Sequence, residues 1–184
     1  FTEEELFNYG DKSIKVQGQY ADPAFFEVFT FPLVYGDAAQ VLQDPNAVVI
    51  SDSVALKIFG TTDVVGKVVK LNNAESFKIS GVMQKVPKNS SLQFDFIMPY
   101  ENYEAENDWL KNWGNNGILT FVQTKKGTDA AALDEKMKHF LTRQDETLDS
   151  ELFLHAYSKQ HLYSDFRKGR TESGLITYVR LFSV

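Results

Sequence analysis

The chain has 184 residues, of which 43% are hydrophobic, with 15 Phe, 8 Tyr and 2 Trp and a formal net charge of −6. This aromatic-rich composition excludes a disordered chain and favours a folded globular domain with a sizeable core. The acidic balance also argues against a nucleic-acid binder, because such proteins carry a basic face and this sequence has only a short basic cluster, Arg167, Lys168 and Arg170.

The chain contains no Cys, which excludes thiol catalysis, disulfides and Cys-based zinc sites. This fits both a reducing cytosol and a bacterial envelope protein without bridges, so the compartment stays open. No run of strictly apolar residues is longer than four, so we expect no membrane span within these residues. Because Phe1 is not an initiator Met and no signal segment follows it, we expect an excised fragment or a processed product.

The first residues predict a β-hairpin. The stretch Glu5–Tyr20 has extended character around Gly10-Asp11, a turn signal of the hairpin type. Ile14 and Val16 alternate with polar residues. Gly18 interrupts this apolar face, which predicts a bulge or a close approach of the backbone.

Two helices and a strand are predicted next. Asp22 is a good N-cap and Pro23 is tolerated at a first helical position, so a short helix is expected there, with phenylalanines at helical spacing. Val48–Ile50 is a compact β-branched run that predicts a buried strand. Ser51 or Asp52 then caps a helix over 53–59, and Gly60 ends it.

The remaining elements give an α+β pattern. Strands are predicted at Val64–Leu71, Phe77–Val86 and Gln93–Met98, with turns at Asn72-Asn73 and Pro87–Ser91. In the second half we predict a loose helix over Tyr100–Trp113 with Trp109 and Trp113 on one face, a strand at Ile118–Gln123, a helix at Asp129–Leu141 capped by Thr128, and a strand at Leu152–Tyr157. We expect a mixed lobe over 1–95, a strand–helix–strand lobe over 96–174 and a distinct terminal segment over 175–184.

No motif predicts a catalytic, cofactor-binding or metal-ligating residue. The glycines of the pair Gly60 and Gly66-Lys67 are one residue too far apart for a phosphate loop, and Val68 stands where Ser or Thr must bind Mg²⁺, so a turn entering a strand is expected. The histidines His139, His155 and His161 lack metal-site spacing.

Three carboxylate runs, Glu3–Glu5, Glu101–Asp108 and Asp145–Glu151, fit no calcium loop and are expected to be solvated faces. Asn89-Ser90-Ser91 matches a glycosylation sequon, although a turn explains the same residues.

The last ten residues, 175–184, are largely apolar. One interpretation is a final strand or helix that docks on the core. The other is the first turns of a transmembrane helix that continues past this segment, with Tyr178 and Arg180 at the interface.

Several segments, in order, resemble the MacB-like periplasmic core domains. The stretch Tyr20–Leu33 is similar to the pattern DPxFFxxFxFPL of that family, and Val48–Ser51 with Ala55–Gly60 is similar to VVIS…AxKxFG. The resemblance continues through Gly66-Lys67, Ile79–Val82, Val86–Ser90, Phe94–Phe96, Trp113–Gly117 and Ile176–Ser183. It covers nearly the whole chain, and it implies that residues 175–184 are the start of the segment that re-enters the membrane.

The resemblance implies a two-lobed fold, with a strand–helix–strand lobe and an inserted β-containing lobe. It also implies a periplasmic domain of an FtsX-like ABC transporter permease in the bacterial inner membrane, which works as a homodimer or heterodimer with a cytoplasmic ATPase. A periplasmic adaptor and an outer-membrane channel are further implied partners. No cofactor is implied, and the expected role is non-enzymatic: to transmit helix movement to export or to periplasmic partners.

One departure from the family pattern concerns the region before Phe1, where family members carry a further strand and helix, so we expect the first lobe to be truncated. Two alternatives remain open. One is a free-standing secreted binding module or hydrolase with a cleft between lobes. The other is a regulator that docks a cell-wall hydrolase.

Overall fold

The computed structural model describes residues 3–115, 117–167 and 170–182, and the chain forms two compact units. The first unit comprises Phe1–Lys111 and Gly117–Val122, and the second comprises Asn112–Asn116 and Gln123–Val184. The chain therefore passes from one unit to the other at three points. Both strands and helices are present, which confirms the α+β class.

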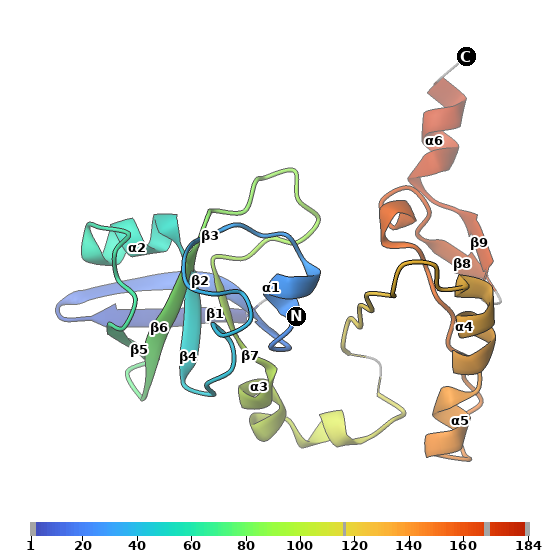
Figure 1. The fold of residues 1–184 in the computed structure, drawn as a ribbon, viewed down its shortest axis with the longest axis horizontal. Coiled ribbons are helices and arrows are strands. Elements are labelled where there is room, and N and C mark those ends of the chain that lie inside the picture. Colours follow the sequence, from blue (N-terminus) through green and yellow to red (C-terminus); the bar gives the residue numbers. More distant parts are fainter. Residues whose placement is uncertain (1–2, 116, 168–169, 183–184) are drawn as a thin grey trace. The chain divides into compact units, whose positions relative to one another are not determined.

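The first unit is a seven-stranded sheet in which six strands close into a ring (Figure 1). Its strands are β1 (Glu3–Tyr9), β2 (Lys12–Ala21), β3 (Leu33–Tyr35), β4 (Ala47–Ser51), β5 (Val68–Leu71), β6 (Glu75–Met83) and β7 (Phe96–Pro99). The order is β3-β6-β4-β7-β2-β1-β5, and β5 also pairs with β6, so only β3 lies outside the ring. Closure removes the free edges of the other six strands.

The predicted hairpin is confirmed as β1 and β2. The two strands pair antiparallel from Glu3↔Gly18 to Tyr9↔Lys12, and Gly10 takes φ +56° in the turn between them. Gly18 has no room for a side chain, since a Cβ there would lie 2.3 Å from the ring of Phe96. The predicted close approach of the backbone at Gly18 is therefore confirmed.

All six strands of the ring contribute to one buried cluster, which fills the interior. Alternate residues of each strand point into it, as Val48 and Ile50 do from β4, while Val49 between them faces a second cluster outside the ring. This double burial explains why every residue of β4 is buried. The interior residues are Phe7, Val16, Val48, Ile50, Val69, Leu71, Phe77, Ile79, Val82, Phe96 and Met98, together with Val54, Ala55, Ile58 and Val64.

The helix α2 (Asp52–Phe59) covers this core with the side chains of Val54, Ala55 and Ile58. Ser51 is its N-cap, because its side chain accepts a hydrogen bond from the backbone N–H of Val54. Gly60 ends the helix in the left-handed conformation with φ +74°. The predicted cap and stop of this helix are both confirmed.

The second apolar cluster lies outside the ring, around the short helix α1 (Phe25–Val28). The N-cap of α1 is Ala24, so the prediction that Asp22 caps this helix is wrong. Asp22 instead accepts a hydrogen bond from the N–H of Ala24 at 2.8 Å in the turn before the helix.

Six phenylalanine rings meet around α1 in pairwise contacts with centroids 4.9–6.2 Å apart. We call Phe25, Phe26, Phe29, Phe31, Phe94 and Phe121 the phenylalanine cluster.

After β7 the chain forms α3 (Tyr100–Glu106) and the 3₁₀ turn η1 (Asp108–Lys111). The helix predicted over Tyr100–Trp113 is therefore too long. Asn107 leaves the helical conformation with φ −128°, so Trp109 and Trp113 do not share one helical face.

The second unit contains α4 (Ala130–Met137), α5 (Phe140–Gln144), η2 (Tyr157–Lys159), the hairpin β8 (Asp165–Arg167) and β9 (Arg170–Ser173), and α6 (Leu175–Phe182). The single helix predicted over Asp129–Leu141 is divided at His139. Asp129, rather than Thr128, is the N-cap of α4, since its carboxylate accepts from the N–H groups of Ala131 and Ala132. Every buried residue among those described lies in the first unit.

The strands predicted at Ile118–Gln123 and Leu152–Tyr157 are not formed in the described structure. The second segment gives its N–H groups to a helix instead: Leu152 donates to the carbonyl of Lys138, and Leu154 donates to the carboxylate of Asp134. Residues 118–122 of the first segment lie in the first unit, where Phe121 packs on Phe29. Among the described residues neither segment pairs with another strand, and a ladder requires such a pairing.

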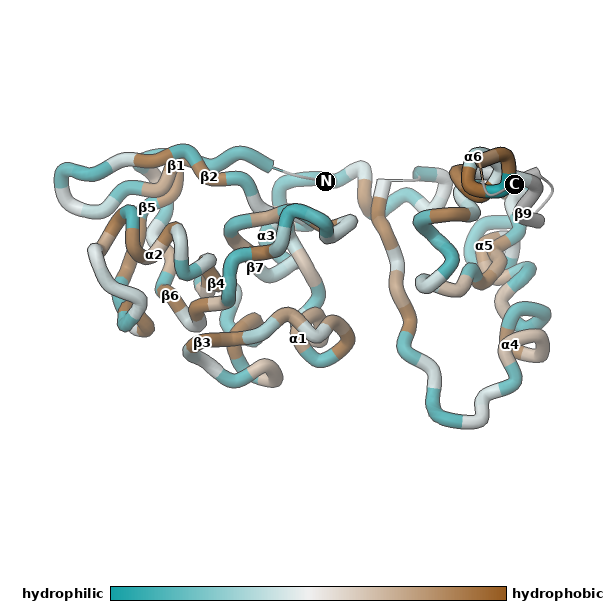
Figure 2. Tube along the Cα trace, turned by 90° about the horizontal axis from the view of Figure 1, so that it is seen from above, coloured by the Kyte–Doolittle hydropathy of each residue, from teal (hydrophilic) through white to brown (hydrophobic). Residues whose placement is uncertain are grey.

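The terminal segment forms the helix α6 rather than a strand. Figure 2 shows it as largely hydrophobic, and most of its apolar side chains are exposed. Ser183 and Val184 lie outside the described residues. Across the described residues, no helix combines the length and the apolar character that a bilayer span needs.

Candidate functional site

A polar junction joins three strands and α2 on the first unit. Asp95, just before β7, accepts a hydrogen bond from the Ser51 hydroxyl at 2.8 Å, and the Ser53 hydroxyl lies 3.4 Å from the same oxygen. The backbone N–H of Asp95 donates to the carbonyl of Gln17 on β2, and its carbonyl accepts from the N–H of Ser51. Ser51 is completely buried, so this junction satisfies a polar group that burial would otherwise penalise.

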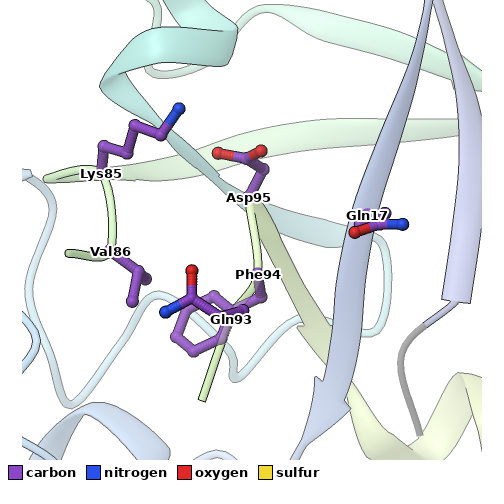
Figure 3. A pocket seen from close by; sticks show the side chains of 6 residues that line it. All are labelled: Gln17, Lys85, Val86, Gln93, Phe94 and Asp95. Carbon is purple, nitrogen blue, oxygen red and sulfur yellow. The ribbon is translucent and has the colours of Figure 1, made fainter. Parts of the chain in front are cut away.

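A shallow hollow opens beside this junction. Figure 3 shows its six lining residues, Gln17, Lys85, Val86, Gln93, Phe94 and Asp95. Its volume of about 80 Å³ holds a few water molecules and is well below the roughly 300–1,000 Å³ of a typical ligand pocket. The Gln93 amide also donates to the carbonyls of Pro87 and Ser90, so it braces its own loop. The geometry supports a structural junction rather than a substrate pocket.

Two of the three carboxylate runs meet around Tyr20. The Tyr20 hydroxyl donates to Glu5 at 3.4 Å, and the Tyr20 ring lies 5.2 Å from that of Tyr103 on α3. Burial raises the pKa of Tyr20 well above its ordinary value, and the charges of Glu5, Glu106 and Glu3 raise it further. Residues about a hundred positions apart in the sequence therefore form one acidic, tyrosine-bearing face.

The glycine motif, the glycosylation sequon and the three histidines have the following positions in the structure. Gly66 has φ +88° in the turn that enters β5, as predicted, and the ammonium of Lys67 lies over the ring of Phe59 at 4.9 Å. Asn89 of the sequon is exposed in a turn. His139 and His161 are exposed, whereas His155 is half-buried with its ring 4.9 Å from that of Phe166.

The described residues contain no group of three or more His, Cys, Asp or Glu arranged to hold a metal ion. Of the basic cluster, Arg167 lies in β8 and Arg170 in β9, and Lys168 lies outside the described residues.

The sequence model of the MacB-like periplasmic core domain matches residues 2–140, which is well over half of the chain. The chain belongs to this family. No curated protein matches it. The family resemblance that the sequence motifs indicated is thereby confirmed, and the MacB-like fold with it.

Solved structures carry the same fold as this MacB-like domain. A domain of a Porphyromonas gingivalis protein named as a permease is 26% identical with a TM-score of 0.63, and the match covers 98% of this chain and 78% of that one. The extracellular domain of the noncanonic ABC-type transporter YknZ from Gram-positive bacteria is 15% identical with a TM-score of 0.55, covering 84% and 78%.

The periplasmic region of MacB from Actinobacillus actinomycetemcomitans is 18% identical with a TM-score of 0.53. That match covers 78% of this chain and 64% of the MacB region, so the chain spans just under two thirds of it.

Sequence reasoning missed both the Asp95 junction and the acidic face. Ser51 was identified as a cap, but its second partner is 44 residues away. The MacB-like domain therefore presents bracing contacts, and neither of these two places has the size or the donor set of an active site.

Proposed function

We propose that the chain is the periplasmic domain of an ABC transporter permease and that it transmits the movement of membrane helices to the periplasm. The observation that carries this proposal is the family match over residues 2–140, together with a fold shared with permease and transporter domains. The division into two units supports it, because transmission needs parts that can change position together or apart.

The role that follows is non-enzymatic. Its partners are a second permease subunit, identical or different, and a cytoplasmic ATPase that hydrolyses the ATP. A periplasmic adaptor and an outer-membrane channel are the partners on the far side. In this proposal the residues 175–184 lead back into the inner membrane, which is consistent with the exposed apolar surface of α6.

The test is a distance measurement in the intact transporter, with and without ATP. The chain has no Cys of its own, so in a transporter whose other parts are also freed of Cys, spin labels can be placed at Leu56→Cys on α2 and Glu135→Cys on α4, both exposed and in different units. We expect the distance distribution between the two labels to change when ATP binds.

The matched control pair is Leu56→Cys with Val34→Cys, both exposed and both in the first unit. This pair should give one distribution in both states. If the pair that spans the two units were equally unaffected by ATP, the transmission role would be wrong.

A further inference from the structure

The segment 112–122, in which the chain leaves the first unit and returns to it, carries two aromatic side chains that pack on different units. Trp113 belongs to the second unit and contacts the ring of Phe140 on α5 at 5.7 Å and 71°. Phe121 belongs to the first unit and contacts the ring of Phe29 at 5.0 Å and 82°. Both pairs have the edge-to-face geometry that aromatic rings prefer. Each unit therefore holds one end of the segment.

The side chain of Phe121 attaches residues 117–122 to the first unit. It is half-buried, whereas Leu119 is 67% exposed and Val122 is 53% exposed. The ring of its partner Phe29 is in turn tilted by 40° against those of Phe25 and Phe31 in the phenylalanine cluster, with centroids 5.0 and 6.2 Å apart. Phe121 thus extends a hydrophobic cluster that the first unit forms largely without it.

Residues 117–129 form no strand or helix, so no regular pattern of backbone hydrogen bonds supports the contact of Phe121 with the first unit. Lys125 and Lys126 lie within this stretch, three and four residues after Val122, and are exposed. Phe121 is one ring at the border of a cluster, and its backbone is irregular. The free energy needed to open such a contact is low compared with that needed to unfold the core. The contact can open without unfolding the ring of strands.

We propose that Phe121 is a releasable anchor that ties the returning segment to the first unit. With the anchor seated, the chain passes between the two units at three points, after Lys111, before Gly117 and after Val122. With the anchor released, the stretch 114–129 is a loop whose two ends both belong to the second unit, and the crossing after Lys111 alone joins the units. The anchor therefore sets whether the units are joined by one connection of the chain or by three.

The experiment uses the chain itself rather than the transporter, so its result is independent of the proposed function. Spin labels at Leu56→Cys and Leu119→Cys report the position of the segment on the first unit, since both residues are exposed and belong to that unit. We expect a narrow distance distribution in the parent chain. Phe121→Ala should broaden or shift it, and Phe121→Leu, which keeps an apolar side chain, should restore part of the narrow component.

A second measurement is the rate of limited tryptic cleavage after Lys125 and Lys126. Loss of the ring contact should speed this cleavage about tenfold, because cleavage follows the population of the open form. Thr120→Ala is the matched control, because Thr120 is exposed and adjacent to the anchor. The proposal is overturned if Phe121→Ala changes neither the distribution nor the cleavage rate, or if Thr120→Ala changes both as much.

Discussion

Gly18 of β2 and Phe96 of β7 are register partners in a parallel strand pair, and the backbone of the first lies against the ring of the second. A Cβ on Gly18 would come within 2.3 Å of two carbons of that ring. Phe96 is completely buried and its centroid is 5.1 Å from that of Phe7. The missing side chain at Gly18 is what lets two phenylalanines share the interior of the ring of strands.

We therefore expect Gly18→Ala to destabilise the first unit by about 3 kcal/mol, at the upper end of the usual overpacking cost. The obstacle is a buried ring rather than the flexible end of a side chain, so it cannot move aside at low cost. Urea unfolding followed by near-ultraviolet circular dichroism measures this loss.

A double-mutant cycle identifies the cause. In a Phe96→Leu background the ring is gone, so Gly18→Ala should cost at least about 1 kcal/mol less than in the parent. Gly10→Ala is the control for backbone effects, since Gly10 has φ +56° and open space around it, and it should cost about 1–2 kcal/mol. Equal costs of Gly18→Ala in both backgrounds would show that the contact with Phe96 is not the reason.

The local parts of this fold were predictable because their signals lie within a few residues of one another. The Gly10-Asp11 hairpin, the Ser51 cap and the Gly60 stop all follow from turn and cap chemistry. The closure of the ring does not follow from such signals. β5 and β6 form a local hairpin across Asn72-Asn73, but β1 meets β5 through the distant pair Phe7↔Leu71, which no local pattern specifies. The same holds for Glu5 and Glu106, whose charges both act on Tyr20 of β2, because β2 pairs with β1 on one side and with β7, which α3 follows, on the other.

The second half was harder to predict for a related reason. Leu152–Tyr157 has the composition of a strand, yet its first N–H groups bind α4. Composition gives the tendency to extend, while the partner decides whether a ladder forms. The lobe boundaries predicted at 95/96 and 174/175 stay predictions about the intact protein.

The second prediction concerns the bond between Ser51 and Asp95. Ser51→Ala removes both the cap of α2 and a buried donor to Asp95, so we expect a loss of about 2 kcal/mol. Asp95→Ala should cost a similar amount. The double variant should cost less than the sum of the two, by about 1 kcal/mol, because the second change removes a bond already broken. Chemical denaturation of the three variants gives these values.

Ser53→Ala is the control in this series. Its hydroxyl lies 2.9 Å from the Ser51 hydroxyl and 3.4 Å from the same carboxylate oxygen, and it does not cap the helix. Ser53→Ala therefore removes one neutral hydrogen bond and leaves the cap in place, so its cost should stay near or below about 1 kcal/mol. A Ser53→Ala cost as large as that of Ser51→Ala would contradict the assignment of Ser51 as the central donor of the junction.

The third prediction concerns Asn72, which fastens the seam between β1 and β5. Register pairs join these strands only at Phe7↔Leu71 and Asn8↔Lys70. Beyond them the Asn72 side chain accepts from the N–H of Leu6 at 3.1 Å and donates to the carboxylate of Glu5. Asn72→Gly keeps the φ of +50° accessible but removes both bonds.

We expect Asn72→Gly to speed hydrogen exchange at the Leu6 amide about tenfold, which corresponds to the loss of roughly one hydrogen bond. Asn73→Gly is the matched control, because Asn73 also has a positive φ and its replacement leaves the bonds of Asn72 in place. Nuclear magnetic resonance of exchanging amides separates the two. The backbone N–H of Asn72, which donates to the carbonyl of Leu6 at 2.9 Å, is kept in both variants. An unchanged Leu6 rate in Asn72→Gly would mean that the Asn72 side chain does not hold the seam.

The fourth prediction concerns the phenol of Tyr20. Burial, and then the charge of Glu5, raise its pKa above that of an unfolded chain, which is about 10. A raised folded pKa means that the stability Tyr20 contributes is fully present below about pH 10. It is lost as the pH rises from there through the folded pKa. Tyr20→Phe has no phenol to ionise and should not show this loss.

Urea unfolding between about pH 8 and about pH 11 tests this difference. The free energy of unfolding of the parent should fall relative to that of Tyr20→Phe by less than about 1.4 kcal/mol per pH unit above pH 10, since Tyr20 is only partly buried. Glu5→Gln should lower the pKa of Tyr20, seen as an earlier rise of phenolate absorbance. Glu4→Gln is the control, because Glu4 pairs with Lys15 at 2.7 Å and does not contact Tyr20. If both variants lowered the Tyr20 pKa equally, overall charge rather than the Glu5 contact would set it.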